Sequence, residues 1–141
     1  MQEVILSDRA PQPVGPYSQA IAISLTPSHK LYFLSGQIPL DPQTGKVTAQ
    51  GIAAQTEQVL ANIQAVLSAS GLSFANVIKT TVFLKDMADF SAMNQIYAKY
   101  FSDLPPARSC VQVSRLPLDV LVEIECIAIA QVADNLTSDL S

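Results

Sequence analysis

The sequence PPARSCVQV, at positions 105–113, begins with two prolines and continues with the alternation of a β-strand. Successive side chains of an extended chain point to opposite faces, so Arg108 falls on one face together with Cys110 and Gln112. The planar guanidinium of an arginine can hold two carboxylate oxygens at once, which the point charge of a lysine cannot do. Arg108 is therefore the first candidate for a binding residue.

A second strand is predicted shortly afterwards, beyond a turn at 116–119. The segment VLVEIECIAI, at positions 120–129, has the length and the β-branched residues of a strand. Glu123 and Glu125 share one of its faces. If this strand pairs with the strand that contains Arg108, opposite charges meet across the sheet, and a salt bridge that only joins the strands is the alternative to a binding site.

Outward from these two strands, the chain alternates between strand and helix patterns. Pro27 and small polar residues separate two apolar runs near the start of the chain, which predicts a hairpin. Beyond a loop at 41–46, the spacing of the apolar residues changes from that of a strand to that of a helix. The predicted elements are strands at 18–23 and 31–35, a helix at 51–70, a strand at 77–84, a helix after Asp89, and the strands at 105–113 and 120–129.

The helix at 51–70 has the clearest periodicity in the chain. Its apolar residues recur on one stripe, and its amide side chains fall elsewhere. Gly71 stands where a residue of left-handed conformation commonly ends a helix. The stripe consists of Ile52, Val59, Leu60, Ile63, Val66 and Leu67, and the amides are Gln55, Gln58, Asn62 and Gln64.

The second helix is expected to begin after Asp89, because aspartate often caps helix N-termini. Its apolar residues are mostly aromatic and also follow helical spacing. Packing against a sheet explains this stripe better than a cofactor site does. The stripe consists of Phe90, Met93, Tyr97, Tyr100 and Phe101.

The order strand, strand, helix, strand, helix, strand, strand predicts an α+β sandwich with both helices on one face of a mixed sheet. The other face is then either solvated or buried against further subunits. Hydrophobic residues make up 49% of the chain and charged residues only 14%. This balance favours burial of the open face in an oligomer.

Composition also narrows the class of protein. The 141 residues fit one domain, which we place at residues 1–130, followed by a polar, acidic tail at 131–141. No apolar run is long enough to cross a bilayer and the N-terminus lacks a secretory signal pattern, so a cytoplasmic protein is expected. The net charge of −4, with eight scattered Lys and Arg residues, argues against nucleic acid as the main partner.

The cysteines do not indicate a metal site or a disulfide framework. Cys110 and Cys126 lie in strand patterns without CxxC spacing, and the single histidine, His29, is expected in an exposed turn. A nucleophilic Cys110 would lack a histidine base, so we reject thiol catalysis. The sequence also contains no phosphate-binding glycine loop and no GxSxG motif.

Several sequence blocks, in order along nearly the whole chain from Ala10 to Ile129, resemble the RidA (YjgF) family of imine deaminases. Each block is weak evidence by itself, whereas their occurrence together in this order is highly specific. The blocks are Ala10-Pro11, GPYSQA at 15–20, SGQIP at 35–39, VIKTTVFLKD at 77–86, Asp89-Phe90 with Asn94 and Tyr97, PARSCV at 106–111, Leu116-Pro117, and EIE at 123–125.

The resemblance implies a chorismate-mutase-like fold and a homotrimer with its sheets facing inward and three equivalent clefts between neighbouring subunits. It also implies hydrolysis of 2-imino acids, such as 2-iminopropanoate and 2-iminobutanoate, to 2-keto acids and ammonia. A small anionic imino or keto acid is therefore the expected partner. The resemblance implies no cofactor and no metal.

The resemblance assigns catalytic roles to two residues. Arg108 matches the arginine that binds the substrate carboxylate, and Glu123 matches the glutamate that positions or activates water. Imine hydrolysis needs such a group because water loses a proton while the nitrogen gains one. The residues alone leave Glu123 and Glu125 equal, and a plain strand carboxylate is the alternative for either.

Further residues match positions that line the family's cleft. Cys110 matches through its backbone, with its side chain shaping the pocket. For Tyr17, Ser35 and Asn94, simple structural roles fit nearly as well: a tyrosine at the edge of the core, a serine at a strand end and an asparagine on a helix surface. Gly36 either permits a close approach or only bends the end of a strand. The matching substrate-binding residues are Tyr17, Ser35, Gly36, Asn94, Arg108 and Cys110.

Three other functions stay open at this point. A non-catalytic trimer that binds a keto acid or an amino acid and reports it to a partner would use Arg108 equally well. An endoribonuclease is disfavoured by the acidic charge and by the absence of a catalytic histidine. A holdase-like chaperone needs exposed apolar surface, which a sequence does not reveal.

Overall fold

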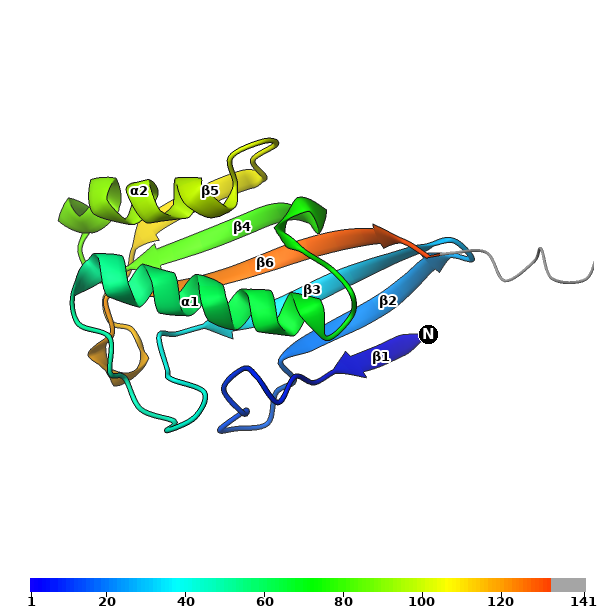
Figure 1. Cartoon of the computed structure of the whole chain (residues 1–141), viewed down its shortest axis with the longest axis horizontal. Coiled ribbons are helices and arrows are strands. Elements are labelled where there is room, and N and C mark those ends of the chain that lie inside the picture. Colours follow the sequence, from blue (N-terminus) through cyan, green and yellow to red (C-terminus); the bar gives the residue numbers. More distant parts are fainter. Residues whose placement is uncertain (133–141) are drawn as a thin grey trace, which may run out of the picture.

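A computed structural model describes residues 1–132, and Figure 1 shows how their helices and strands are arranged. Six strands form one sheet in the order β1-β2-β3-β6-β4-β5. Both helices lie on the same side of this sheet (Figure 1). The elements are β1 Gln2–Ile5, β2 Ala20–Thr26, β3 His29–Gln37, α1 Gly51–Ser68, β4 Val77–Leu84, α2 Phe90–Tyr100, β5 Ala107–Gln112 and β6 Val122–Gln131.

The predicted α+β sandwich, with two helices on one face of a mixed sheet, is confirmed. β6 pairs antiparallel with β3 and with β4, whereas β5 pairs parallel with β4. β4 therefore separates the strand of Arg108 from the strand of Glu123. Direct pairing of those two strands, considered from the sequence, is wrong, because an earlier segment of the chain is inserted between them.

Two features at the start of the sheet differ from the prediction. β1 is a sixth strand that the sequence patterns do not indicate, because it has only four residues and is mostly exposed at the sheet edge, paired with β2. His29 was expected in an exposed turn. It is instead half-buried as the first residue of β3, because the hairpin register already pairs it with Thr26.

α1 follows the predicted periodicity and ends as expected. Gly71 has φ +72°, and the backbone N–H groups of Gly71 and Leu72 each donate over 3.0 Å to carbonyls of the last turn. The amides are the exception to the simple stripe. Gln55 exposes only 8% and Asn62 only 1% of its surface, so part of the polar side of α1 is inside the protein.

α2 begins differently from the prediction. The Asp89 side chain makes no capping hydrogen bond, whereas Asp86 accepts a hydrogen bond over 2.9 Å from the Ala88 N–H at the start of a short 3₁₀ turn. The turn of Met87–Asp89 moves the polar cap three residues upstream. The aromatic stripe packs into the core as predicted, with Met93, Tyr97 and Phe101 buried and Phe90 and Tyr100 packed against it.

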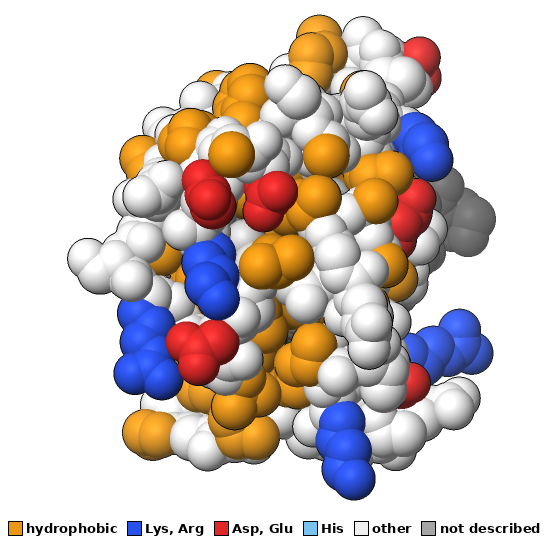
Figure 2. All heavy atoms as spheres, turned by 90° about the vertical axis from the view of Figure 1, so that its left-hand side faces the viewer, with side chains coloured by type: hydrophobic (Ala, Val, Ile, Leu, Met, Phe, Trp, Pro, Cys, Tyr) orange, Lys and Arg blue, Asp and Glu red, His pale blue; other side chains and the backbone are white. Residues whose placement is uncertain are grey.

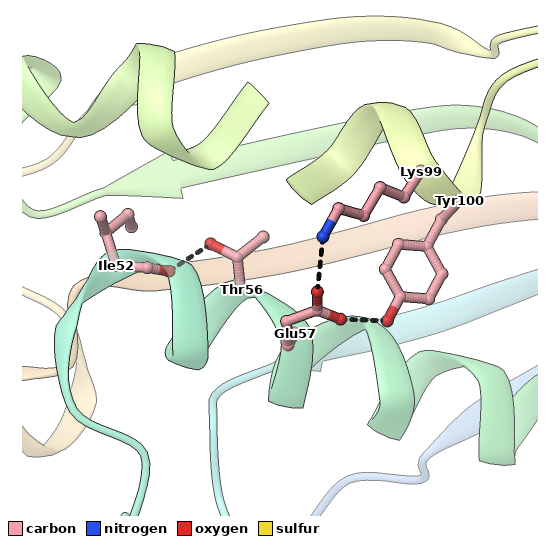
Figure 3. Close-up of polar contacts among 5 residues, drawn as sticks. All are labelled: Ile52, Thr56, Glu57, Lys99 and Tyr100. Carbon is pink, nitrogen blue, oxygen red and sulfur yellow. Dashed lines mark hydrogen bonds and ion pairs between the residues drawn. The ribbon is translucent and has the colours of Figure 1, made fainter. Parts of the chain in front are cut away.

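The two helices are joined on their outer side by one carboxylate, as Figure 3 shows. Glu57 of α1 accepts a hydrogen bond from the hydroxyl of Tyr100 and forms an ion pair of 3.5 Å with Lys99, both on α2. On the same helix, the Thr56 hydroxyl donates over 2.7 Å to the Ile52 carbonyl. Glu57 therefore links helix to helix, whereas Thr56 bonds only within α1.

The sheet face opposite the helices carries apolar side chains that no element within residues 1–132 covers. Val4, Phe33 and Val111 expose 62%, 41% and 43% of their surface there. The strand registers align Val4 with Ile21 and Phe33 with Ile127 on this face. Such a surface is typical of an interface with another chain.

The C-terminal strand begins and ends two residues later than predicted. Gln131 still belongs to β6, and the Val132 N–H donates over 2.6 Å to the Ser28 carbonyl. The rest of the expected tail, residues 133–141, lies outside the described residues. None of the helices described is long and apolar enough to cross a membrane.

Candidate functional site

A cavity of about 340 Å³ lies where β3 ends and β6 begins. It combines four of the residues singled out from the sequence with an apolar wall. Figure 2 looks onto this end of the molecule and shows hydrophobic side chains between acidic and basic ones. The cavity is lined by Pro11, Val14, Tyr17, Ser35, Gly36, Gln37, Ile38, Leu40, Pro117 and Glu123.

A β-bulge shapes the floor of this cavity. In the β3–β6 register, Leu34 pairs with Cys126 and Gln37 with Ile124, so two residues of β3, Ser35 and Gly36, stand opposite one residue of β6. The extra residue bends β3 at the site. Bulges of this kind redirect side chains and are frequent beside active sites.

Gly36 lies directly against the side chain of Glu123. A Cβ atom at Gly36 would collide with Oε1 of Glu123 and would lie 3.1 Å from its Cδ. Gly36 is not among the residues with positive φ, so conformational freedom does not explain the glycine. Of the two roles considered from the sequence, the structure favours close approach, here by a carboxylate.

The environment of Glu123 favours its protonated form. Burial raises the pKa of the Glu123 carboxyl above its ordinary value, and the negative charge of Glu125 on the same face raises it further. Glu125 itself is exposed and does not line the cavity. The structure thus distinguishes two carboxylates that the sequence left equal, and a raised pKa suits a group that exchanges protons near neutrality.

Tyr17 and Ser35 both line the cavity. The Tyr17 side chain is half exposed, and its hydroxyl accepts a hydrogen bond over 3.4 Å from the Val14 N–H. The Ser35 hydroxyl donates over 2.6 Å to the Ser18 carbonyl. Ser35 thereby fastens the segment before β2 to the bulge, and its oxygen still has lone pairs that can accept a hydrogen bond.

Arg108 lies in a different environment, under α2. Its guanidinium donates over 2.6 Å to Oδ1 of Asn94, and it stacks on the ring of Tyr97 at 4.7 Å and on that of Phe90 at 5.5 Å. No ion pair within residues 1–132 involves Arg108. The salt bridge to Glu123 or Glu125 that the sequence left open is wrong, because Arg108 faces the helices.

Arg108 and Glu123 point to opposite faces of the sheet. Arg108 pairs with Thr80, whose buried hydroxyl lies 2.7 Å from that of Tyr97 on α2. Glu123 pairs with Phe83, three residues further along β4 and therefore on the other face. A single chain brings together Tyr17, Ser35, Gly36 and Glu123, but keeps Asn94 and Arg108 apart from them.

Cys110 shares the face of Arg108 and is half-buried. Burial raises the pKa of its thiol, and the positive charge of Arg108 offsets this only in part. Thiolate is the reactive form of cysteine, so this environment gives no activated nucleophile. Within residues 1–132, no group of three or more His, Cys, Asp or Glu side chains is arranged to hold a metal ion.

The apolar wall of the cavity is the part that sequence reasoning missed. Ile38, Leu40 and Pro117 come from two loops, and loop conformation leaves no periodic pattern. The connection of these loops to the helix is visible only in the folded structure. Asn62 interrupts the buried side of α1, and its amide group is bonded to the loop that contains Ile38 and Leu40.

Comparisons with known proteins agree with this architecture. A family model described as Endoribonuclease L-PSP matches residues 7–130. A RutC family protein of Pyrococcus horikoshii is 55% identical over 128 residues, which cover 91% of this chain and 98% of the relative. A protein of Arabidopsis thaliana named Reactive Intermediate Deaminase A, chloroplastic, is 50% identical over 127 residues, covering 90% of this chain and 65% of the relative.

Solved structures show the same similarity. The crystal structure of Escherichia coli TdcF with bound serine is 43% identical, with a TM-score of 0.80, and the match covers 90% of this chain and 98% of that one. A Yersinia pestis protein, YyfA of the Rid family, is 45% identical with a TM-score of 0.85, and the match covers 91% and 98%.

Proposed function

Because the chain belongs to the RidA (YjgF) family, we propose that it hydrolyses reactive 2-imino acids to 2-keto acids and ammonia. The proposed substrates are 2-iminopropanoate and 2-iminobutanoate. The observation that carries the proposal is the close contact of the Glu123 side chain with Gly36 in the wall of a cavity. There a half-buried carboxylate with a raised pKa faces space for a small molecule.

The substrate's carboxylate is assigned to Arg108. The guanidinium is already oriented by Asn94 and by the ring of Tyr97, so little conformational entropy is lost when an anion binds. Asn94 is its only hydrogen-bond acceptor among residues 1–132, which leaves other N–H groups for a bidentate contact. An imino acid and a keto acid both offer the planar carboxylate that fits this fork.

We propose that the complete site forms between subunits of a homotrimer. Arg108 and Glu123 belong to opposite faces of one sheet, so they can act on one small molecule only if they come from different chains. The uncovered apolar sheet face supplies the surface for this association. Each cleft would then combine Arg108 of one subunit with Tyr17, Ser35, Gly36 and Glu123 of the next.

The proposed reaction begins with an imino acid held by Arg108 through its carboxylate. Glu123 takes a proton from a water molecule while the water oxygen attacks the C=N carbon, and passes that proton to the nitrogen to give the neutral carbinolamine. In the second step Glu123 takes the hydroxyl proton of the carbinolamine and delivers it to the nitrogen as the C–N bond breaks, so that a 2-keto acid and ammonia leave and Glu123 is again a carboxylate. Free imines already hydrolyse in water, so orientation and one proton relay suffice, and the proposal includes no cofactor.

The test is a deaminase assay in which a threonine dehydratase generates 2-iminobutanoate and semicarbazide competes for it. The wild-type protein is expected to accelerate imine loss, whereas Arg108→Ala and Glu123→Gln are expected to lose that acceleration while staying folded. Failure of the folded wild-type protein to accelerate imine loss would contradict the proposal for these substrates.

A second candidate is a non-catalytic trimer that binds an amino acid or a keto acid and reports it to a partner. The observation that favours it is the serine bound to the structural neighbour TdcF. The Glu123→Gln variant separates the two functions. It should retain keto-acid binding and lose imine hydrolysis if Glu123 is catalytic, whereas a sensor would show no hydrolysis in either form.

The description of the matched family as Endoribonuclease L-PSP keeps an RNA-cleaving activity as a third candidate. The formal net charge of −4 disfavours it, because RNA binding relies on neutralisation of phosphates by Lys and Arg. This candidate would be supported if the protein cleaved RNA and the cleavage became slower as the salt concentration was raised. The cytoplasmic location stays a prediction, and the Arabidopsis relative is named as chloroplastic. The holdase-like activity stays an untested alternative.

A further inference from the structure

Three buried amide side chains surround the candidate cavity without lining it. Gln19 exposes 1%, Gln55 8% and Asn62 1% of its surface. Each bonds to main-chain groups of a loop, and the residues of these loops form the cavity walls. Buried amides are costly unless satisfied, so their common placement needs an explanation.

Gln19, just before β2, fixes the first wall. Its Oε1 accepts a hydrogen bond over 2.6 Å from the Ser7 N–H, and its Nε2 donates over 3.0 Å to the Ser7 carbonyl and over 2.9 Å to the Pro11 carbonyl. Pro11 lines the cavity. The Gln19 side chain thus makes the hydrogen bonds to this loop that a neighbouring strand would make to a strand.

Asn62, in the middle of α1, fixes the second wall. Its Nδ2 donates over 3.2 Å to the Ile38 carbonyl and over 2.9 Å to the Leu40 carbonyl, while its Oδ1 accepts over 2.9 Å from Gln58. Ile38 and Leu40 both line the cavity. Both amide hydrogens of Asn62 are therefore used to hold one loop against the helix.

Gln55, two turns earlier on α1, fixes the third wall. Its Oε1 accepts over 2.8 Å from the Leu121 N–H, and its Nε2 donates over 3.2 Å to the Ala49 carbonyl. Leu121 stands between the turn that contains Pro117 and the first residues of β6, where Glu123 lies. The position of this segment sets the position of the carboxylate.

We propose that Gln19, Gln55 and Asn62 are positioning residues for the deamination, each acting through a loop and not through contact with the substrate. This inference rests on the proposed function. Without the amides, loop groups that they bond, such as the Pro11 and Leu40 carbonyls, would turn to water and the walls would shift. Displacements of about 1 Å near a reacting group reduce rates by up to about a hundredfold.

The test compares Asn62→Asp with Thr56→Val, a matched control on the same helix. Thr56 is fully buried and its hydroxyl bonds only to Ile52 within α1, so its removal costs stability without reaching a loop. In Asn62→Asp, an ionised carboxylate faces two carbonyl oxygens and cannot donate to either. We expect kcat/KM to fall by about tenfold or more in Asn62→Asp and to stay within about twofold of wild type in Thr56→Val.

A pH series provides a readout that general destabilisation does not give. Once protonated, the introduced carboxyl can donate to one of the two carbonyls, so kcat/KM of Asn62→Asp, relative to wild type, should recover as the pH falls. Asn62→Ala, which introduces no charge, should show a loss without this recovery. If Asn62→Asp does not fold, Asn62→Ala alone carries the comparison with Thr56→Val.

Amide hydrogen exchange separates this inference from the proposed function. The Leu40 N–H, which donates over 2.8 Å to the Ile38 carbonyl, should exchange faster in either Asn62 variant and remain protected in Thr56→Val. If the wild type hydrolyses no imine but this pattern holds, the proposed function fails while Asn62 still positions the loop. Unchanged Leu40 exchange together with wild-type kcat/KM in the folded Asn62 variants would overturn the inference, as would an equal loss of activity in Thr56→Val.

Discussion

The carboxyl group of Glu123 occupies the space that a side chain at position 36 would need, so Gly36 and Glu123 form one unit of the site. The contact explains why the bulge in β3 contains a glycine although its backbone does not require one. It also gives the carboxylate its partly desolvated position, from which its raised pKa follows.

Gly36→Ala should therefore disable the site without unfolding the protein. The new methyl group would push the Glu123 carboxyl out of place, and we expect a loss of about a hundredfold in kcat/KM for imine hydrolysis. Gly15→Ala is the matched control, because a Cβ there would meet the Tyr17 ring only at an ordinary 3.7 Å. Equal activity of Gly36→Ala and Gly15→Ala would refute the steric argument.

The raised pKa of Glu123 has a consequence for stability against pH. An acid whose pKa is higher in the folded state stabilises the fold below its ordinary pKa, and this contribution is lost as the pH rises through the raised value. Glu123→Gln should therefore be more stable than wild type at neutral pH, by less than about 1 kcal/mol because solvent screens the group. Urea unfolding at acidic and neutral pH measures this, and a variant that is less stable than wild type at neutral pH would contradict it.

Arg108→Lys should weaken substrate binding although the charge is kept. A lysine loses the planar fork, the stacking on Tyr97 and the geometry of the hydrogen bond to Asn94. We expect KM for the imino acid to rise by about tenfold or more, with a small change in melting temperature. Arg9→Lys, at an exposed position, is the control and should keep the wild-type KM.

The link between the helices should matter for stability but not for catalysis. Tyr100→Phe removes the hydrogen bond to Glu57 and is expected to cost about 0.5–1.5 kcal/mol of unfolding free energy. Burial and the nearby carboxylate raise the pKa of Tyr100 to about 12, so the hydroxyl stays protonated at neutral pH. Thermal unfolding measures the loss, and a drop in kcat beyond about twofold in Tyr100→Phe would show that the helices communicate with the site.

Much of the fold follows from periodicity, and the failures have identifiable physical causes. The α1 stripe and the end of α1 at Gly71 are local patterns, so they could be predicted. Strand order is not local: nothing in the sequence of β5 or β6 indicates that β4 lies between them. The short strand β1 is held by pairing with β2, since its own four residues show no alternating burial.

The candidate site, like the fold, was only partly predictable from the sequence. Arg108 and Glu123 were identified from residue type and family resemblance, but their opposite directions depend on the sheet register. The burial of Asn62 depends on a loop that packs across α1, because an isolated helix would expose that amide beside its apolar stripe. Sequence patterns thus give the chemical groups, whereas tertiary packing gives their relative positions.

Each proposed site combines Arg108 of one subunit with Glu123 of another, so the mixing of variant subunits is a direct test. Arg108→Ala and Glu123→Gln proteins, each inactive alone, are unfolded together in equal amounts, refolded and assayed for imine hydrolysis. If the groups come from different chains, half of the subunits can supply each group, so roughly a quarter of wild-type activity should return. A mixture that assembles into hybrid oligomers and stays as inactive as its parents would show that Arg108 and Glu123 do not act together across a subunit boundary.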